Sequence, residues 1–161
     1  MEQNPLTVMI PDCALTVPEY RQWIDSVESK LSTMDGAVDR HTLTDEYPLK
    51  HTFTPGLYIR EFTMPAGSLV TSRIHMFEHP YIISKGTVSV YNGEEVVTYE
   101  APYQGVTPPG TKRLLYCHTE VVWTTFHTTE INNVQELEDS GTIVCDTFNE
   151  FDQLVHKEIT L

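Results

Sequence analysis

Apolar residues between positions 17 and 34 recur at steps of three and four, the spacing of one face of an α-helix. The members of this stripe are Tyr20, Trp23, Ile24, Val27, Leu31 and Met34. Thr16 and Glu19 have the spacing of a capping box, in which each side chain satisfies a backbone N–H of the first turn. The pattern predicts an amphipathic helix that begins after Thr16 and ends before Gly36.

The periodicity changes from about residue 57 to residue 129, where short runs rich in Val, Ile, Thr and Tyr predict antiparallel β-strands. Turn sequences separate these runs at Pro65-Ala66-Gly67, Asn92-Gly93 and Pro108-Pro109-Gly110. Asn92-Gly93 lies between the strand-like segments 87–91 and 94–99, and such a pair favours the positive φ angles of a type I′ turn. We therefore expect a tight hairpin at this position.

The C-terminal part is again mixed. Residues 133–138 are weakly helical, residues 142–145 can pair as an edge strand, and Thr147 and Glu150 form a second capping-box pattern. This pattern predicts a short helix that ends near His156. Residues 35–51 are expected to form a polar connection. We predict one structural domain: an N-terminal helix and connection (1–54), a barrel (55–129) and a C-terminal extension (130–161).

Composition narrows the classes of function. The 161 residues suit a single domain, and 23 acidic against 10 basic residues give a net charge of −13. Because Lys and Arg form no basic stripe, we expect no nucleic-acid partner. Cys13, Cys117 and Cys145 form no C-x-x-C pair, which suits a reducing compartment. The chain has no secretion signal and no long apolar run, so we expect a cytoplasmic protein without a membrane partner.

His75, Glu78 and His79 are the densest group of acid/base or metal-binding residues. The letters match an inverted zinc-peptidase motif, which requires a helix, but the β-branched residues before His75 and Pro80 after His79 oppose one. On a straight strand their Cα atoms would be about 13 Å apart. Two nitrogens on one zinc ion lie within roughly 4 Å of each other. A shared metal therefore requires a bend between the two histidines, and two surface or hydrogen-bonded histidines are the alternative.

The same region resembles the cupin superfamily. Gly67 and Gly86 match the two glycines of its first motif, His75 falls at a paired-histidine position and His79 at the position of the motif's glutamate. Pro108-Pro109-Gly110 resembles the second motif, although the glycine expected before it is replaced by Pro102. The resemblance covers about residues 55–129 and extends to small cupin-domain proteins of tailed bacteriophages. It implies a mainly β, cupin-like jelly-roll barrel.

The resemblance also implies four metal-ligand positions, occupied here by Arg73, His75, His79 and Arg113. Guanidinium groups stay protonated and cannot bind a metal ion, so the usual site is expected to be degenerate. His127 ends a strand-like run that begins at Val121, and it can face the interior. His75, His79 and His127 would then form a reduced site for Fe, Mn, Ni or Zn.

Three functions follow as hypotheses. The first is a protein that binds a small anionic molecule through Arg73, His75, His79 and Arg113. The second is a metal-dependent enzyme that uses His75, His79 and His127. The third is a structural or interaction protein of a bacteriophage, located in the host cytoplasm or the virion. Each arginine has a plainer alternative, a salt bridge to Glu61, Glu78 or Glu100. We also expect a homodimer or larger assembly.

Overall fold

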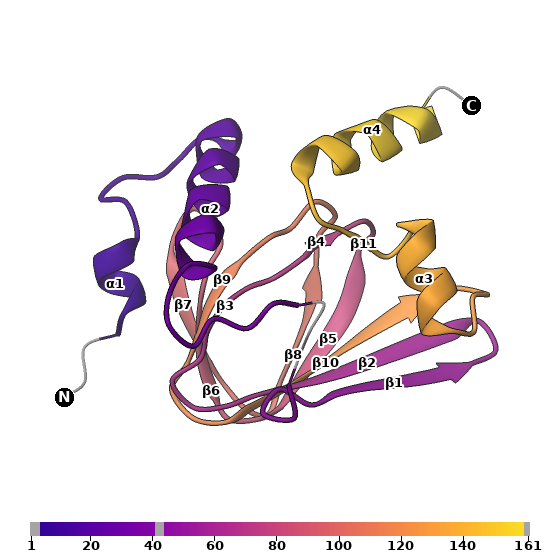
Figure 1. The fold of residues 1–161 in the computed structure, drawn as a ribbon, viewed down its shortest axis with the longest axis horizontal. Coiled ribbons are helices and arrows are strands. Elements are labelled where there is room, and N and C mark those ends of the chain that lie inside the picture. The colour runs from indigo at the N-terminus through magenta and orange to yellow at the C-terminus, as the bar shows by residue number, and fades with distance from the viewer. Residues whose placement is uncertain (1–3, 41–43, 160–161) are drawn as a thin grey trace.

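A computed structural model describes residues 4–40 and 44–159 of the chain, with side chains described as far as residue 156. Its strands form two large antiparallel sheets and one two-stranded sheet, and helices α2 and α4 lie over one end of them (Figure 1). The helices are α1 (Leu6–Met9), α2 (Val17–Leu31), α3 (Val134–Ser140) and α4 (Phe148–Ile159). The strands are β1 (Leu49–Thr54), β2 (Leu57–Met64), β3 (Leu69–Thr71), β4 (Ile74–His75), β5 (His79–Lys85), β6 (Thr87–Tyr91), β7 (Val96–Glu100), β8 (Tyr103–Thr107), β9 (Leu114–Cys117), β10 (Val121–Thr128) and β11 (Val144–Cys145).

The two sheets pack face to face. One has the strand order β1-β2-β10-β5-β8 and the other β3-β9-β6-β7, while β4 and β11 pair separately. A single apolar cluster joins the inner faces, with buried members from β2, β5, β6, β9 and β10: Met64, Tyr81, Ile83, Val88, Val90, Leu115, Cys117, Val121 and Trp123. The predicted fold class, a mainly β jelly roll with helical segments at both ends, is confirmed.

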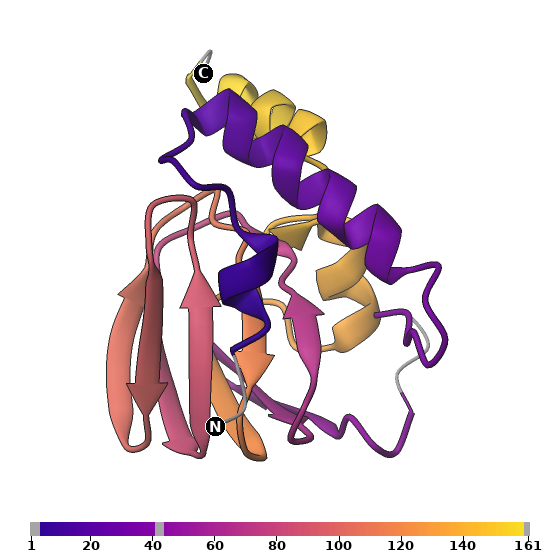
Figure 2. The ribbon, with the colours of Figure 1, turned by 90° about the vertical axis from the view of Figure 1, so that its left-hand side faces the viewer.

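Helix α2 covers one end of the sandwich beside α4 (Figure 2). The predicted capping box is present, because the Thr16 hydroxyl accepts from the Glu19 N–H and the Glu19 carboxylate accepts from the Thr16 N–H. Ile24 and Val27 are buried in a second apolar cluster with Ile74 of β4. The apolar stripe thus fixes α2 over the barrel end at which β4 lies.

Two predictions about the strands need correction. The hairpin between β6 and β7 exists, but its turn is not type I′, because no non-glycine residue in the described chain has positive φ. The Asn92 carboxamide instead accepts from the N–H groups of Glu94 and Glu95, which makes a longer loop. The polar connection expected over residues 35–51 also ends earlier, since β1 begins at Leu49 and pairs along its whole length with β2. The sequence pattern did not predict β1, because the residues before it are mainly polar and its pairing with β2 is not visible in the local sequence.

The C-terminal segment reaches back to the barrel. Strand β11 pairs antiparallel with β4, with Val144 opposite His75, as an edge strand over 142–145 requires. Thr147 accepts from the Glu150 N–H at the start of α4, but the Glu150 carboxylate accepts from the Asp146 N–H, so the second capping box is only half formed. The extension therefore contributes directly to the barrel end that carries the histidines.

Candidate metal centre and ligand cavity

Three histidines from separate strands converge inside the barrel. His75 ends β4, His79 begins β5 and His127 lies near the end of β10. The ring centroid of His79 lies 4.3 Å from that of His75 and 4.5 Å from that of His127. One potential ligand atom from each ring lies within 4.8 Å of the others. The structure therefore brings together the three residues predicted as a reduced metal site.

The chain bends between His75 and His79, as a shared site requires. Strand β4 is only two residues long and is held on one side by β11 and on the other by a bond from the Gly110 N–H to the His75 carbonyl (2.7 Å). The chain then turns through residues 76–78, where Phe77 faces outward with 48% of its surface exposed. His79 re-enters the interior opposite Thr107 of β8. A helical zinc-peptidase arrangement is excluded by this backbone.

Hydrogen bonds orient the rings. The Nδ1–H of His79 donates to the Phe77 carbonyl (3.0 Å), which leaves Nε2 with a free lone pair. That Nε2 and the Nδ1 of His75 are buried without a hydrogen-bond partner in the described chain. The Nε2 of His127 is hydrogen-bonded to the Thr125 hydroxyl (2.8 Å), and its ring stacks on Tyr58. Buried nitrogens without partners are uncommon and point to an absent binding partner.

Electrostatics keep these rings neutral. Burial lowers the pKa of His75 well below its ordinary value, and the nearby His79, His127, Arg60 and Arg113 add to the effect. Burial and then His79 and Arg60 lower the pKa of His127 to about 3. Burial likewise lowers the pKa of His79, against the raising effect of its bond to Phe77. Neutral imidazoles are the form that binds metal ions.

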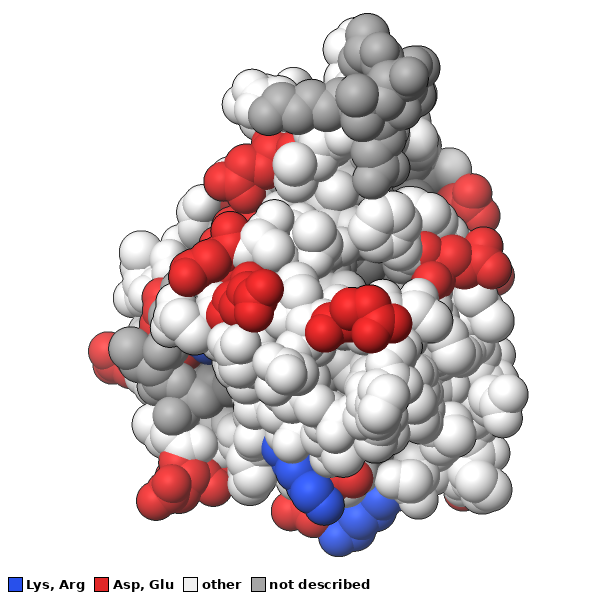
Figure 3. All heavy atoms as spheres, turned by 90° about the vertical axis from the view of Figure 1, so that its right-hand side faces the viewer, with Lys and Arg blue, Asp and Glu red and all other residues white. Residues whose placement is uncertain are grey.

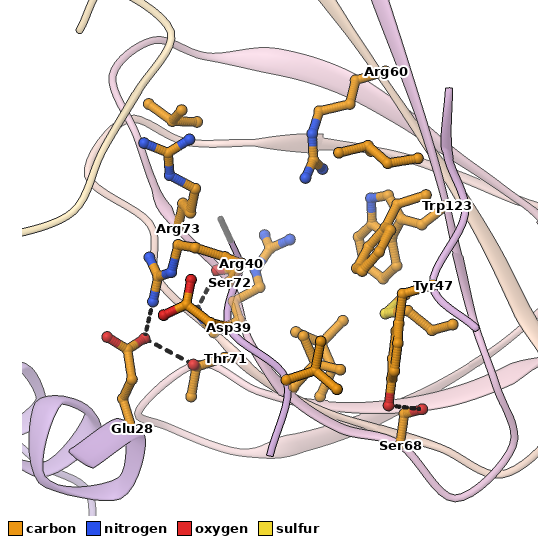
Figure 4. A pocket seen from close by; sticks show the side chains of 18 of the residues that line it. Glu28, Asp39, Arg40, Tyr47, Arg60, Ser68, Thr71, Ser72, Arg73 and Trp123 are labelled. Atoms are coloured by element: carbon orange, nitrogen blue, oxygen red, sulfur yellow. Dashed lines mark hydrogen bonds and ion pairs between the residues drawn. The ribbon is translucent and has the colours of Figure 1, made fainter. Parts of the chain in front are cut away.

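A cavity of about 610 Å³ adjoins the histidines. Figure 4 shows Tyr47 and Trp123 on one side of it, with Arg40, Arg73 and Glu28 on the other. Further apolar lining comes from Leu49, Phe62, Met64, Val70 and Leu115. The volume and the mixed lining are those of a small-molecule site.

The predicted arginines behave differently from each other. Arg73 lines the cavity, but its guanidinium is bound to Glu138 (2.7 Å) and Asp146 (3.0 Å) of the C-terminal extension. It therefore makes a salt bridge, although not to Glu61, Glu78 or Glu100. Arg113 also lines the cavity, donates to the Thr107 hydroxyl at 3.3 Å and lies over the Tyr81 ring.

Arg60 is a cavity residue that the sequence reasoning missed. It faces inward from β2 and is opposite Thr125 of β10, between the inward-facing Tyr58 and Phe62. The alternation of residues 58, 60, 62 and 64 on one face of a strand is the signal that could have found it. The guanidinium lies over the Phe62 ring, 5.3 Å from its centroid.

The three histidines fit a metal ion. Imidazole suits Fe, Ni and Zn, and three histidine ligands with open positions are characteristic of catalytic sites. Nitrogens bound to one such ion are separated by roughly 3–4 Å. The ligand atoms here lie within 4.8 Å of one another, about 1–2 Å beyond that range, which rotation of the rings can close. Thr125 and the Phe77 carbonyl supply the hydrogen bonds that commonly orient metal-binding histidines.

Comparison with known proteins gives structural matches only. No protein-family model and no curated protein sequence matches the chain. A cupin-2 domain from Rhodospirillum rubrum is similar with a TM-score of 0.47 and 14% identity over 60% of this chain and 68% of that one. A cupin-2 protein from Shewanella frigidimarina has a TM-score of 0.44 and 10% identity, covering 62% and 98%. An acetylacetone dioxygenase from Acinetobacter johnsonii has a TM-score of 0.42 and 20% identity, covering 59% and 80%.

The chain thus resembles cupin-domain proteins in its fold. The narrower resemblance to phage-encoded proteins, the location in host cytoplasm or virion and the homo-oligomeric assembly stay predictions. None of the helices in residues 4–40 and 44–159 is long and apolar enough to span a bilayer.

Proposed function

We propose that this protein binds a divalent metal ion through His75, His79 and His127 and a small molecule in the adjoining cavity. The observation that carries the proposal is the pair of buried nitrogens, His75 Nδ1 and His79 Nε2, that lack hydrogen-bond partners beside a third histidine. An unpaired buried polar atom costs about 1–3 kcal/mol. Coordination of a metal ion would offset this cost in the bound protein.

When bound, Fe, Mn, Ni or Zn would supply Lewis-acid or, for the redox-active metals, electron-transfer chemistry at open coordination positions. The protein's own residues perform other tasks. The Phe77 carbonyl holds the proton of His79 on Nδ1, and Thr125 fixes the ring of His127. Trp123 and Phe62 give the cavity an apolar surface against which a ligand can pack.

The centre differs from a four-ligand cupin site in its charge. Arg60 and Arg113 are near enough to the histidines to lower their pKa values. Fixed positive charges repel a divalent cation, and this repulsion is stronger in a partly dry pocket than in water. We therefore propose that the metal is held more weakly than by four protein ligands. A negatively charged ligand in the cavity would counter the repulsion.

The test begins with protein purified without a histidine tag and analysed for metal content. Titration of the metal-free protein with Co²⁺ then gives a visible spectrum that reports nitrogen ligands. We expect one ion per chain, and we expect His75→Ala, His79→Ala and His127→Ala each to weaken binding by about 100-fold or more. The matched control is His118→Ala, because His118 is exposed and does not line the cavity. Equal binding by the three variants and the control would refute the metal centre.

A further inference from the structure

Four arginines line the cavity, and they fall into two pairs. Arg40 forms ion pairs with Glu28 and Asp146, and Arg73 with Glu138 and Asp146. Arg60 and Arg113 form no ion pair with any carboxylate in residues 4–40 and 44–156. Two guanidinium charges near the histidine centre are therefore not neutralised by the protein.

Arg60 and Arg113 are both half-buried, and Arg60 faces the open cavity. Its side chain lies in the wall of the cavity and points into the open space (Figure 4). Burial lowers its pKa below the ordinary arginine value. Tyr58 and Glu138 act in the opposite direction on this pKa without a hydrogen bond or ion pair to Arg60, and the Phe62 ring gives the charge a contact worth about 0.5–2 kcal/mol, less than the cost of enclosing a charge. The arrangement favours an anionic partner from outside the chain.

The surface of the molecule does not share this character. On the face shown in Figure 3, acidic side chains are spread widely and basic ones appear at the lower edge. The chain as a whole carries a net charge of −13. The cavity lining also holds four carboxylates, from Glu28, Asp35, Asp39 and Glu138, so its net charge does not select an anion. The two arginines without an ion pair indicate recognition of a small anion, because a large anionic surface would be repelled by the acidic exterior.

We propose that the cavity ligand is an organic acid with an apolar body, whose carboxylate is bound by Arg60 and flanked by Arg113. This inference rests on the proposed function of the cavity as a ligand site. The planar fork of a guanidinium matches a carboxylate and gives two parallel hydrogen bonds. The histidine centre lies beside the same two arginines, so the acid binds with its charged end toward that centre.

The aromatic lining next to Arg60 accounts for the apolar body. Tyr47 and Trp123 present aromatic surface to the cavity, and Tyr47 is fixed by a hydrogen bond between its hydroxyl and Ser68. Burial of apolar ligand surface contributes about 25 cal/mol per Å². Inorganic phosphate has no such surface and carries more charge than one fork neutralises. A hydrophobic carboxylate therefore suits both the arginines and the aromatic lining, whereas phosphate suits the arginines alone.

The proposal predicts reciprocal coupling between acid and metal. A carboxylate placed beside Arg60 neutralises charge that opposes the metal ion, so each ligand strengthens binding of the other. This coupling requires no movement of the protein.

The experiment compares acids with their uncharged amides of equal shape. Benzoate and benzamide, hexanoate and hexanamide, and inorganic phosphate are titrated calorimetrically into metal-free and Co²⁺-loaded protein. We expect each acid to bind at least about tenfold more tightly than its amide, because hydrogen bonds to charged groups are the strong ones. Arg60→Gln is expected to abolish this preference and Arg113→Gln to reduce it. Failure of both acids to exceed their amides in the wild-type protein overturns the proposal, as does tighter binding of phosphate.

The matched control is Arg21→Gln, since Arg21 is paired with Asp152 on the outside of α2 and does not line the cavity. It should keep the preference for acids, and loss of the preference in this variant as much as in Arg60→Gln overturns the assignment to Arg60. The wild-type comparison needs no variant and stands if Arg60→Gln misfolds. A preference for acids in a protein that binds no Co²⁺ supports the carboxylate site and contradicts the metal centre. Binding of Co²⁺ without a preference for acids supports the metal centre and contradicts the carboxylate site.

Discussion

The two ends of the barrel interior differ sharply, although the same strands build both. Along β10 the inward-facing residues run from Val121 and Trp123 to Thr125 and His127. Opposite them on β2 lie Met64, Phe62, Arg60 and Tyr58, in matching register. Each strand therefore changes from apolar to polar within four inward positions.

The apolar end of the barrel stabilises the fold, whereas the polar end holds the candidate site. The apolar end joins the two sheets and consists of residues that are almost completely buried. The polar end contains the unpaired histidine nitrogens and the two unneutralised arginines, which oppose folding in the free protein. Burial of apolar side chains at one end therefore offsets the free-energy cost of the unpaired polar groups at the other. The predictions below test this division.

The largest effect is expected at the apolar end. Ile83 is 0% exposed within the apolar cluster of the sandwich. Ile83→Ala should lower the free energy of unfolding by about 2–5 kcal/mol, because it removes buried apolar surface and leaves a cavity. Denaturant titration measures the loss, and Co²⁺ titration of the folded protein should show unchanged affinity. A large loss of metal affinity would mean that the two ends are not separable.

An intermediate effect is expected where α2 closes the polar end. The Glu28 carboxylate accepts hydrogen bonds from Thr71 and Arg40 and pairs with Lys112, whose side chain is 1% exposed. Burial raises the pKa of Glu28, but these partners outweigh it and hold the pKa below its ordinary 4.5. Glu28→Gln should destabilise the protein by about 1–3 kcal/mol, because Lys112 loses a buried partner.

The pH dependence gives a second readout of Glu28. Because its pKa is lower in the folded protein, its contribution is complete above pH 4.5 and is lost as the pH falls through the folded value. The stability difference between wild type and Glu28→Gln should therefore shrink in acid below that point. Acid titrations of both proteins, followed by circular dichroism, measure it. A difference that stays constant through the acid range would show that ionised Glu28 is not responsible.

The smallest effect should have the opposite sign. His75 Nδ1 is buried without a partner, so His75→Leu replaces an unsatisfied polar ring with an apolar side chain of similar size. We expect the metal-free protein to become more stable by about 1 kcal/mol while metal binding is lost. Chemical denaturation in the presence of a chelator measures the gain, and His118→Leu, which removes a hydrogen bond to buried Ser89, should instead lower stability. A destabilised His75→Leu would show that the ring supports the fold.

Much of the fold was predictable from local patterns. The spacing of Thr16 and Glu19 located the start of α2, and the β-branched runs after residue 57 located most strands. Features that depend on distant partners were missed. Strand β1 exists because β2 lies beside it, and the loop after Asn92 is shaped partly by Tyr20, whose ring lies against Gly93.

The candidate site shows the same division. The need for a bend between His75 and His79 followed from ligand distances, and the alternation of β10 suggested His127. Whether an arginine faces a carboxylate or an open cavity depends on segments far away in the chain. Arg73 meets Glu138 and Asp146 only because β11 folds back onto β4.

The sequence by itself determined the kinds of element, the inward face of each long strand and the three imidazoles available for a metal ion. These properties depend on side-chain period and chemistry, which neighbouring residues express locally. Only the tertiary structure decided which arginines keep an unneutralised charge. Ion pairing depends on through-space distance, and packing of the C-terminal extension and α2 against the barrel sets that distance.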